Sequence, residues 1–565
     1  MQRIRLQTDP LPVLLIVNTS SRVTLSLLRC VEWVNPDHIG LVLSEDWKAR
    51  TAAEMVYLPL SAWSLLLVLF CSAKAIYTLW WKPKSLERQL RHQGIKGNPY
   101  RVLYGDMADD KKARAMALSK PIDLTHRIVH RASPFLHQLL QKYGKRSMVW
   151  VGTTPRVIIY DSEMMAEVLI DRTHQFQKPT FNPLVKLLAM GVSTLEGEEW
   201  ANRRKIINPA FHLEKLKSMV PAFQKSCIDM VERWQNMISD RGSCEVDVWD
   251  ELQNLTGDVI SRTAFGSNYK EGKKIFELQK EQVLLVMEAA RIPYIPGFRF
   301  VPTSSNKRRM LIDNEIRSLL KDMINKKTDA ISKGEATGDD LLGLLVQYSN
   351  DKARGDHSIT IDDVIEECKL FYFAGQETTS VLLTWTLILL SIHPEWQQRA
   401  REEVLSVCGK ELPDFESISH LKLVTMILYE VLRLYPPVIA LVRRTIKTAK
   451  IGDHLSLPAG VEVFLPIIFI HHDREIWGED VEEFKPERFS EGVAKASKVS
   501  NAFFPFGWGP RICLGQNFAM IEAKIALARI LQQFCVELSP SYAHAPRTII
   551  TLQPQFGAQL ILHQL

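Results

Sequence analysis

The most informative segment of the chain, Phe503–Leu531, reads FFPFGWGPRICLGQNFAMIEAKIALARIL. It places Cys513 between a loop rich in glycine and a stretch with the apolar spacing of an amphipathic helix. Gly507 and Gly509 allow the backbone to turn sharply and to approach a flat ligand closely. A cysteine near the start of a helix is favoured as a thiolate by the helix dipole, and Arg511 adds a positive charge. These features favour a thiolate, but a lone cysteine is more often a buried structural residue, and without the surrounding sequence that role would be preferred.

The spacing around this cysteine, Phe506-x-x-Gly509-x-Arg511-x-Cys513-x-Gly515, resembles the haem-binding loop of the cytochrome P450 family. The resemblance implies that Cys513 is the axial ligand of the iron of haem b, where a thiolate pushes electron density onto the metal. It also implies the cytochrome P450 fold, which is mainly α with small β-sheets (α+β), as a single large haem domain behind an N-terminal transmembrane helix. The loop residues expected to contact the haem with Cys513 are Phe506, Gly507, Arg511 and Gly515.

A second segment, FYFAGQETTS (Phe371–Ser380), lies in a long apolar stretch and matches the oxygen-activation pattern of the same family. Ala374 and Gly375 leave room beside a helix for a small ligand, and Thr378 shares a helix face with Ala374. A threonine hydroxyl there is able to loosen the backbone ladder and hold a water. We expect Glu377 to relay protons inward from solvent, so Glu377 and Thr378 are the predicted catalytic residues. A capping or surface role for this segment is disfavoured by its place between apolar residues.

Two further motifs follow in the order that the family shows. Glu430 and Arg433 are three residues apart and share a helix face, a pairing that alone is common on solvated helices. The segment Pro486–Phe489, PERF, contributes Arg488. The resemblance gives Glu430, Arg433 and Arg488 the role of a buried structural network, which should tolerate the loss of no member.

Three residues are expected to bind the haem propionates. In the family, a tryptophan and an arginine spaced as Trp200 and Arg204 reach one propionate, and Arg443 occupies a second propionate-binding position. A guanidinium suits a carboxylate because it offers two parallel hydrogen bonds. The neighbouring Arg444 competes with Arg443 for this assignment, and a surface salt bridge is the alternative for each arginine.

A set of apolar residues beside these motifs is expected to line the substrate pocket by resemblance. Each is equally well explained as ordinary core, because apolar residues are usually buried for packing. They are Phe181, Leu187, Phe371, Phe373, Ile439, Ala440 and Leu441.

The N-terminal part contains one apolar run of membrane length. No charge occurs from Met55 to Ala73, and after Lys74 the run continues to Trp81, close to the ~20 residues that a bilayer requires. Basic residues follow it, so the positive-inside rule places the C-terminal side in the cytosol, on the endoplasmic reticulum membrane. A cleaved signal peptide is the alternative. The expected organisation is an extension of doubtful significance (1–54), an anchor (55–81), a basic connector rich in glycine and proline (82–100) and the haem domain (101–565).

Composition excludes several classes of protein. The net charge is +6 over 565 residues without a basic run, which disfavours a nucleic-acid binder. Eight cysteines without a CxxC pair disfavour a disulfide-stapled secreted protein and a zinc ribbon. Short β-like runs are expected at 147–152, 156–161, 461–465 and 548–552.

The chain has no GxGxxG fingerprint, so electrons are expected from NADPH through the membrane-bound NADPH–cytochrome P450 reductase. Lys524 is a candidate for the docking face, and a solvated helix face explains it equally well.

The resulting prediction is a haem-thiolate monooxygenase that inserts one atom of O2 into a C–H bond of a hydrophobic substrate. The segments KGNPYR, KPTFNPLVKLL and WANRRKIINPAFHLEKLK resemble the plant group that includes secologanin synthase. That resemblance implies a terpenoid-derived substrate: a triterpenoid, an iridoid or a gibberellin-like diterpenoid. The alternatives are a related isomerase or dehydratase that needs no reductase, a non-catalytic haem protein, and a membrane-tethered interaction protein without haem.

Overall fold

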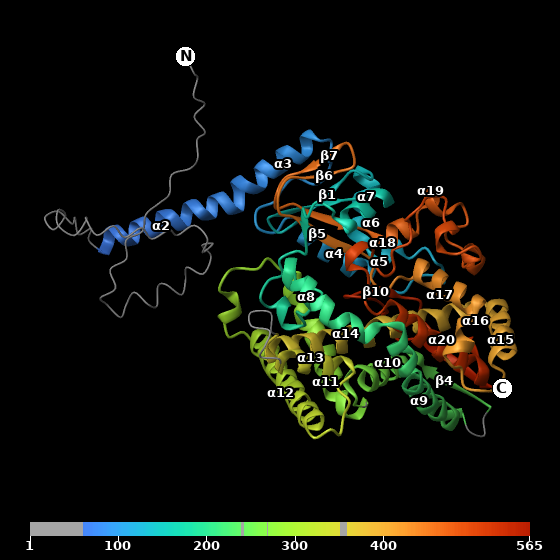
Figure 1. Ribbon diagram of the computed structural model, residues 1–565. Coiled ribbons are helices and arrows are strands. Elements are labelled where there is room, and N and C mark those ends of the chain that lie inside the picture. Colours follow the sequence, from blue (N-terminus) through green and yellow to red (C-terminus); the bar gives the residue numbers. More distant parts are fainter. Residues whose placement is uncertain (1–59, 239–241, 268, 351–358) are drawn as a thin grey trace, which may run out of the picture. The chain divides into compact units, whose positions relative to one another are not determined.

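The computed structural model describes residues 60–238, 242–267, 269–350 and 359–565 (Figure 1). The chain divides into two units, Met1–Ser72 and Ala73–Leu565. The expected N-terminal extension, 1–54, and residues 55–59 of the expected anchor lie outside the described residues. The second unit carries every predicted site residue.

The described chain is mainly helical, as the resemblance predicted. Its α-helices are α2 (Leu60–Ile76), α3 (Lys82–His92), α4 (Met107–Ala117), α5 (Val129–Ala132), α6 (Pro134–Tyr143), α7 (Ser162–Ile170), α8 (Gly197–Ile207), α9 (Leu213–Ile238), α10 (Val248–Phe265), α11 (Tyr269–Ala290), α12 (Ser304–Ser332), α13 (Leu341–Asn350), α14 (Ile361–Ile392), α15 (Pro394–Cys408), α16 (Phe415–His420), α17 (Lys422–Leu434), α18 (Ile467–His471), α19 (Arg474–Trp477) and α20 (Gln516–Gln533). Short 3-10 turns include η9 (Pro486–Phe489) and η11 (Gly509–Arg511).

The strands form small sheets. They are β1 (Met148–Val151), β2 (Thr154–Ile158), β3 (Phe176–Gln177), β4 (Ser243–Asp247), β5 (Leu441–Thr445), β6 (Ala449–Ile451), β7 (Leu455–Leu457), β8 (Glu462–Leu465), β9 (Phe534–Leu538), β10 (Pro546–Thr548), β11 (Leu552–Pro554) and β12 (Gln559–Gln564). One sheet has the order β1-β2-β8-β5-β3, in which only β2 and β8 run parallel, and another has the order β4-β12-β9. The pairs β6–β7 and β10–β11 complete the described sheets.

Two of the four expected β-like runs are confirmed, since 147–152 and 461–465 contain β1 and β8, and the run 156–161 is confirmed in part, since β2 covers only its first three residues. The fourth, 548–552, is wrong: this segment forms the turn between β10 and β11. The hydroxyl of Thr551 in that turn donates a hydrogen bond to Glu377 on α14. The turn is therefore bound to a residue that is remote in sequence, and the local pattern does not record that contact.

Helix α14 occupies the centre of the second unit (Figure 1). It begins at a capping box, in which Thr360 and Asp363 exchange hydrogen bonds between side chain and backbone. From Val381 to Leu390 every side chain is buried, as expected for a helix that is apolar on nearly all sides. Contacts with α10, α17, α20 and β9 hold α14 in place. The oxygen-activation motif is thus carried on the most enclosed helix of the fold.

The apolar N-terminal run is helical wherever it is described. Among the described residues, the helix Ala62–His92 is the one that is long and apolar enough to cross a membrane by length and composition. It contains a five-residue π-helix, Tyr77–Trp81, between α2 and α3. In the segment expected as a connector, the helix continues to His92, and Leu86 and Leu90 are buried in the hydrophobic core.

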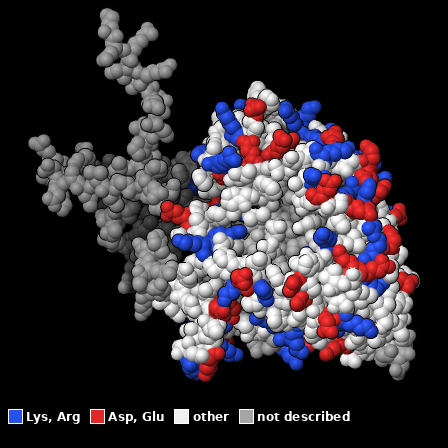
Figure 2. Space-filling view, turned by 45° about the vertical axis from the view of Figure 1, so that its right-hand side comes forward, with Lys and Arg blue, Asp and Glu red and all other residues white. Residues whose placement is uncertain are grey.

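Positive and negative side chains are interspersed over the face shown in Figure 2. A band of uncharged residues crosses that face between them. Charges of the two signs are therefore mixed on this face.

Candidate active site

Cys513 ends a tight loop that leads into α20. Its N–H donates a hydrogen bond to the carbonyl oxygen of Phe506 at 2.9 Å and closes the loop. Gly509 has a φ of 71°, and a side chain there would meet the carbonyl oxygen of Leu169 in α7 at 2.7 Å. Both the backbone conformation and the close neighbour therefore require glycine. The loop is held against α7, which fixes the position of the cysteine.

The electrostatics of Cys513 differ from the expectation of a favoured thiolate. Solvent reaches the thiol although protein atoms surround it closely, and burial raises its pKa above the ordinary value. The N–H of Gly515 and the charge of Arg204 lower the pKa by less. Arg511 was expected to supply that charge, but its guanidinium is paired with Glu196. The positive partner of the thiol is therefore Arg204.

Three cations lie close to one another near Glu196: Lys178, Arg443 and Arg511. We call them the cationic cluster. Burial and the charges of Arg443 and Arg511 lower the pKa of Lys178 to about 7, although Glu196 acts against this. Burial and Arg511 likewise lower the pKa of Arg443 to about 10. Two carboxylates, Glu196 and Asp171, act on these three cations, so the cluster keeps at most one unbalanced positive charge and has the chemistry of an anion site.

The other predicted propionate residues lie next to the cluster. The guanidinium of Arg511 lies over the ring of Trp200, 4.4 Å from its centroid. Arg204 donates hydrogen bonds to the carbonyl oxygen of Ile512 at 2.8 Å and to Asn208 at 3.1 Å. Trp200 and Arg204 therefore reach the cysteine loop from α8.

The choice between the two adjacent arginines is decided by burial. Arg443 is 5% exposed and belongs to the cluster, whereas Arg444 contacts the hydroxyl of Thr180. Sequence reasoning did not assign Lys178 a role, although the residue begins the segment KPTFNPLVKLL. Its place in the cluster follows from the pairing of β3 with β5, which sets Gln177 opposite Arg444.

The two predicted catalytic residues point to different surroundings. The hydroxyl of Thr378 donates to the carbonyl oxygen of Ala374 at 2.8 Å. The carboxylate of Glu377 is 6% exposed and accepts hydrogen bonds from Gln253 at 3.2 Å, from Thr551 and from Gln553. Burial raises the pKa of Glu377 despite these donors. The carboxylate is thus enclosed by protein donors, and a proton relay through Glu377 stays a prediction.

Gly375 does not leave free space beside α14. A side chain built there would lie 2.7 Å from Ile260 of α10. Glycine at this position therefore permits the close packing of two helices, and the expected room for a small ligand is filled by Ile260. Ala374 is half-buried and is the remaining small residue of the motif.

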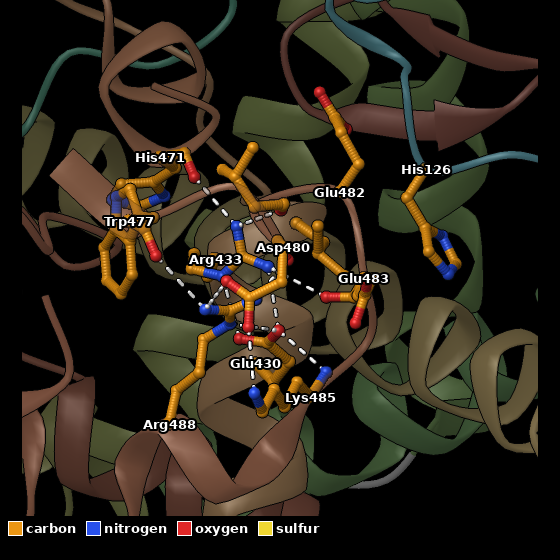
Figure 3. Close-up of polar contacts among 12 residues, drawn as sticks. His126, Glu430, Arg433, His471, Trp477, Asp480, Glu482, Glu483, Lys485 and Arg488 are labelled. Atoms are coloured by element: carbon orange, nitrogen blue, oxygen red, sulfur yellow. Dashed lines mark hydrogen bonds and ion pairs between the residues drawn. The ribbon is translucent and has the colours of Figure 1, made fainter. Parts of the chain in front are cut away.

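The structural network forms as the sequence indicated (Figure 3). Arg433 makes two hydrogen bonds of 2.8 Å to Glu430, and both side chains are fully buried on α17. Arg488 of η9 reaches Glu430 at 3.4 Å. Asp480, which sequence reasoning missed, pairs with Arg488 at 2.8 Å. Hydrogen bonds from Arg488 and Lys485 outweigh burial and lower the pKa of Asp480 to about 2.

Comparison with known proteins agrees with this arrangement. The family described as Cytochrome P450 matches residues 125–559. The chain is a cytochrome P450. Its relatives include Cytochrome P450 CYP72A616 of Paris polyphylla, which is 57% identical over 86% of this chain and 95% of its own length. The 7-deoxyloganic acid hydroxylase of Catharanthus roseus is 52% identical over 88% of this chain and 97% of its own length. The 11-oxo-beta-amyrin 30-oxidase of Glycyrrhiza uralensis is 52% identical over 87% of this chain and 95% of its own length.

Membership of the family makes the protein a P450 monooxygenase that uses haem, takes electrons from NADPH through a reductase and acts on a hydrophobic substrate. The residues of this site fit the haem. Cys513 is a free cysteine just before the start of α20, and the cationic cluster lies beside Trp200. Haem carries two propionates, which are the kind of anionic group that such a cluster binds. The described cysteines are all free.

The predicted pocket residues do not share one environment. Phe371 is 8% exposed and stacks on Phe211 with ring centroids 5.6 Å apart, so it packs in the core, and its pocket assignment stays a prediction. Phe181 is exposed. The remaining pocket candidates are half-buried: Leu187, Phe373, Ile439, Ala440 and Leu441.

Lys524, the candidate for the reductase face, donates a hydrogen bond to the carbonyl oxygen of Ile418 at 3.2 Å and is half-buried. This contact gives Lys524 a structural role between α20 and α16.

Proposed function

We propose that this P450 oxidises a C–H bond of a terpenoid-derived substrate, a triterpenoid, an iridoid or a gibberellin-like diterpenoid. The observation that carries the proposal is the 52% identity, over at least 87% of the chain, to proteins named as a 7-deoxyloganic acid hydroxylase and an 11-oxo-beta-amyrin 30-oxidase. The half-buried apolar residues 439–441 support it, because Leu441 lies 3.8 Å from the side-chain position of Gly507 in the cysteine loop. An apolar substrate would find an apolar wall beside the cysteine.

We assign the iron to Cys513 and the propionates to Arg443, Arg511, Lys178 and their neighbours Trp200 and Arg204. When bound, the haem supplies the activation of O2. The cationic cluster orients it by bidentate and charge-assisted hydrogen bonds. Arg204 is close enough to the thiol to stabilise the thiolate, whose pKa burial otherwise raises. The protein thus supplies the ligand, the orientation and the charge.

Thr378 and Glu377 are proposed to hold and move protons. The Thr378 hydroxyl is already committed as a donor to Ala374, so its oxygen is free to accept a hydrogen bond from a water. Glu377 is held away from solvent by Gln253, Thr551 and Gln553. Transfer of a proton from Glu377 toward Thr378 therefore requires that the carboxyl first leave these donors.

We further propose a single-pass protein of the endoplasmic reticulum membrane with the catalytic domain in the cytosol. Support comes from the apolar helix and from the cations Lys82, Lys84, Arg88 and Arg91 that follow it.

An optical titration of the microsomal protein with a panel of terpenoids tests the substrate class. A substrate that displaces water from the ferric iron shifts the Soret band toward the high-spin form. A saturable shift with one scaffold, and product formation that depends on NADPH and reductase, would establish the class. A normal haem spectrum with no shift for any terpenoid would refute the substrate proposal and leave the P450 assignment intact.

A further inference from the structure

Directly after the apolar run, α3 carries a cavity of about 620 Å³. Its walls are two tryptophans, three cations and one carboxylate, together with Ser85 and Pro99. The charged and aromatic lining residues are Trp80, Trp81, Lys84, Glu87, Arg88 and Arg91. All belong to the second unit of the chain, and none takes part in the candidate active site.

Glu87 lines this cavity, is buried and is paired with two of its cations. It pairs with Lys84 at 2.8 Å and with Arg91 at 2.9 Å, and it accepts the N–H of Tyr100 at 3.2 Å. Arg91 also donates to the carbonyl oxygens of Gly97 and Asn98. These contacts fix two of the three cations, so the cavity keeps its shape without a ligand.

Arg88 differs from the other cations of the cavity. It is exposed, and among the described residues no hydrogen bond or ion pair engages its guanidinium. The lining carries three positive charges and one negative charge, which leaves an excess of two. A rigid, positively charged cavity with a free guanidinium suits a phosphate group.

The tryptophans identify the source of that phosphate. Trp80 and Trp81 are 50% and 68% exposed, and Lys84 lies over the Trp80 ring at 5.5 Å. Exposed tryptophans at the end of an apolar helix prefer the headgroup level of a bilayer. Cations at the cytoplasmic end of such a helix are attracted to anionic lipid.

We propose that the cavity bounded by Trp80, Trp81 and Arg88 is a binding site for the headgroup of an anionic phospholipid. The phosphate accepts hydrogen bonds from Arg88, and the tryptophan rings lie against the upper part of the headgroup. Bound lipid would fix the orientation of α3, and through the buried Leu86 and Leu90 that of the domain, relative to the bilayer. This site is independent of the substrate proposed above and rests only on the membrane location.

The test uses the full chain in nanodiscs of phosphatidylcholine, with and without phosphatidylserine. After gentle detergent extraction, native mass spectrometry counts the phosphatidylserine retained by the protein. Arg88→Gln should lower this retention about fivefold, the loss expected for one cation near an anionic surface. Ser85→Glu, which places a carboxylate on the cavity wall, should lower it further. The carbon monoxide spectrum of each variant shows whether the fold is intact.

Arg172→Gln is the matched control, because Arg172 is exposed, is without a described partner and lies outside the cavity. It should retain phosphatidylserine like the wild type. Equal retention by Arg88→Gln and wild type would overturn the proposal. Displacement of the lipid by inorganic phosphate would assign the cavity to a soluble anion instead. Unchanged lipid retention with weakened reductase binding would assign it to a protein partner.

Discussion

At the residue scale, the chemistry depends on single side chains whose surroundings were set by distant parts of the chain. Cys513 is accompanied by Arg204 of α8 rather than by its near neighbour Arg511. Glu377 is clamped by residues of α10 and of the β10–β11 hairpin. Substitutions at such positions should change one chemical property each while the fold persists.

Cys513→Ser should lose the haem-thiolate spectrum and the monooxygenase activity, because a hydroxyl is a poor iron ligand in place of a thiolate. The reduced carbon monoxide spectrum measures this. Cys244→Ser is the control: Cys244 lies in β4 and donates only to the carbonyl oxygen of its neighbour Glu245. A normal spectrum in Cys513→Ser would show that another residue binds the iron.

Thr378→Ala should keep its haem and consume NADPH without matching product, because the hydroxyl proposed to hold a water beside Ala374 is gone. The ratio of product formed to NADPH consumed measures the coupling. Thr386→Ala is the matched control for Thr378→Ala. The hydroxyl of Thr386, on the same helix, likewise donates a hydrogen bond to the carbonyl oxygen four residues earlier, that of Leu382, at 2.7 Å. Uncoupling of both variants to the same extent would deny Thr378 a special role.

At the element scale, helices are held by contacts that leave little tolerance. Helices α10 and α14 approach closely where Gly375 meets Ile260. Helix α17 is tied to η9 and the preceding segment by the network of Glu430, Arg433, Arg488 and Asp480. These two contacts predict stability effects of different origin, one steric and one electrostatic.

Gly375→Ala should destabilise the protein by about 1–3 kcal/mol, the usual cost of overpacking a core. Thermal unfolding measures the loss, and Ile260→Val in the same chain should recover part of it by withdrawing a methyl group. Uncoupled NADPH consumption with unchanged stability would instead support the original expectation of an oxygen-binding groove at Gly375.

Arg488→Met should cost about 1.5–3 kcal/mol, the usual loss for hydrogen bonds to charged groups, because Asp480 then keeps only Lys485 as a charged partner and Glu430 keeps only Arg433. The control is Arg474→Met, since Arg474 is 57% exposed and its partner Glu479 is 89% exposed at 3.5 Å. Such surface pairs contribute at most about 1 kcal/mol. The two variants should therefore differ clearly in their free energy of unfolding in denaturant. Equal losses of stability in the two variants would contradict the network.

At the scale of the whole molecule, distant segments are joined by a buried cluster of histidines. His126 bonds to Tyr435 at 3.0 Å and to His393 at 3.2 Å, and His544 bonds to the carbonyl oxygen of Thr125 at 3.2 Å. Burial lowers the pKa of His126 to about 3 and that of His544 to about 4. The cluster ties the segment before α5 to α15, α17 and the segment before β10.

The protein should consequently lose stability in mild acid. Both histidines are neutral when folded and take up a proton near pH 6.5 when unfolded, so the unfolded state binds more protons below that pH. Stability should be complete above about pH 6.5 and fall by up to about 1.4 kcal/mol per pH unit for each histidine toward pH 4. Unfolding midpoints measured against pH test this. His544→Gln should reduce the slope of stability against pH. An unchanged slope would show that His544 does not contribute to it.

Sequence alone was sufficient for the family, the helical fold and the Glu430–Arg433 pair. Those features depend on residues that are close in the chain, where a loop or one helix turn sets the geometry. Tertiary structure decided the rest, because it depends on which remote segments pack together. Pairing of β3 with β5 brought Lys178 to Arg443, and Ile260 filled the space beside Gly375. The β10–β11 turn closed on Glu377, since buried polar groups bond to whichever donors the fold brings within reach.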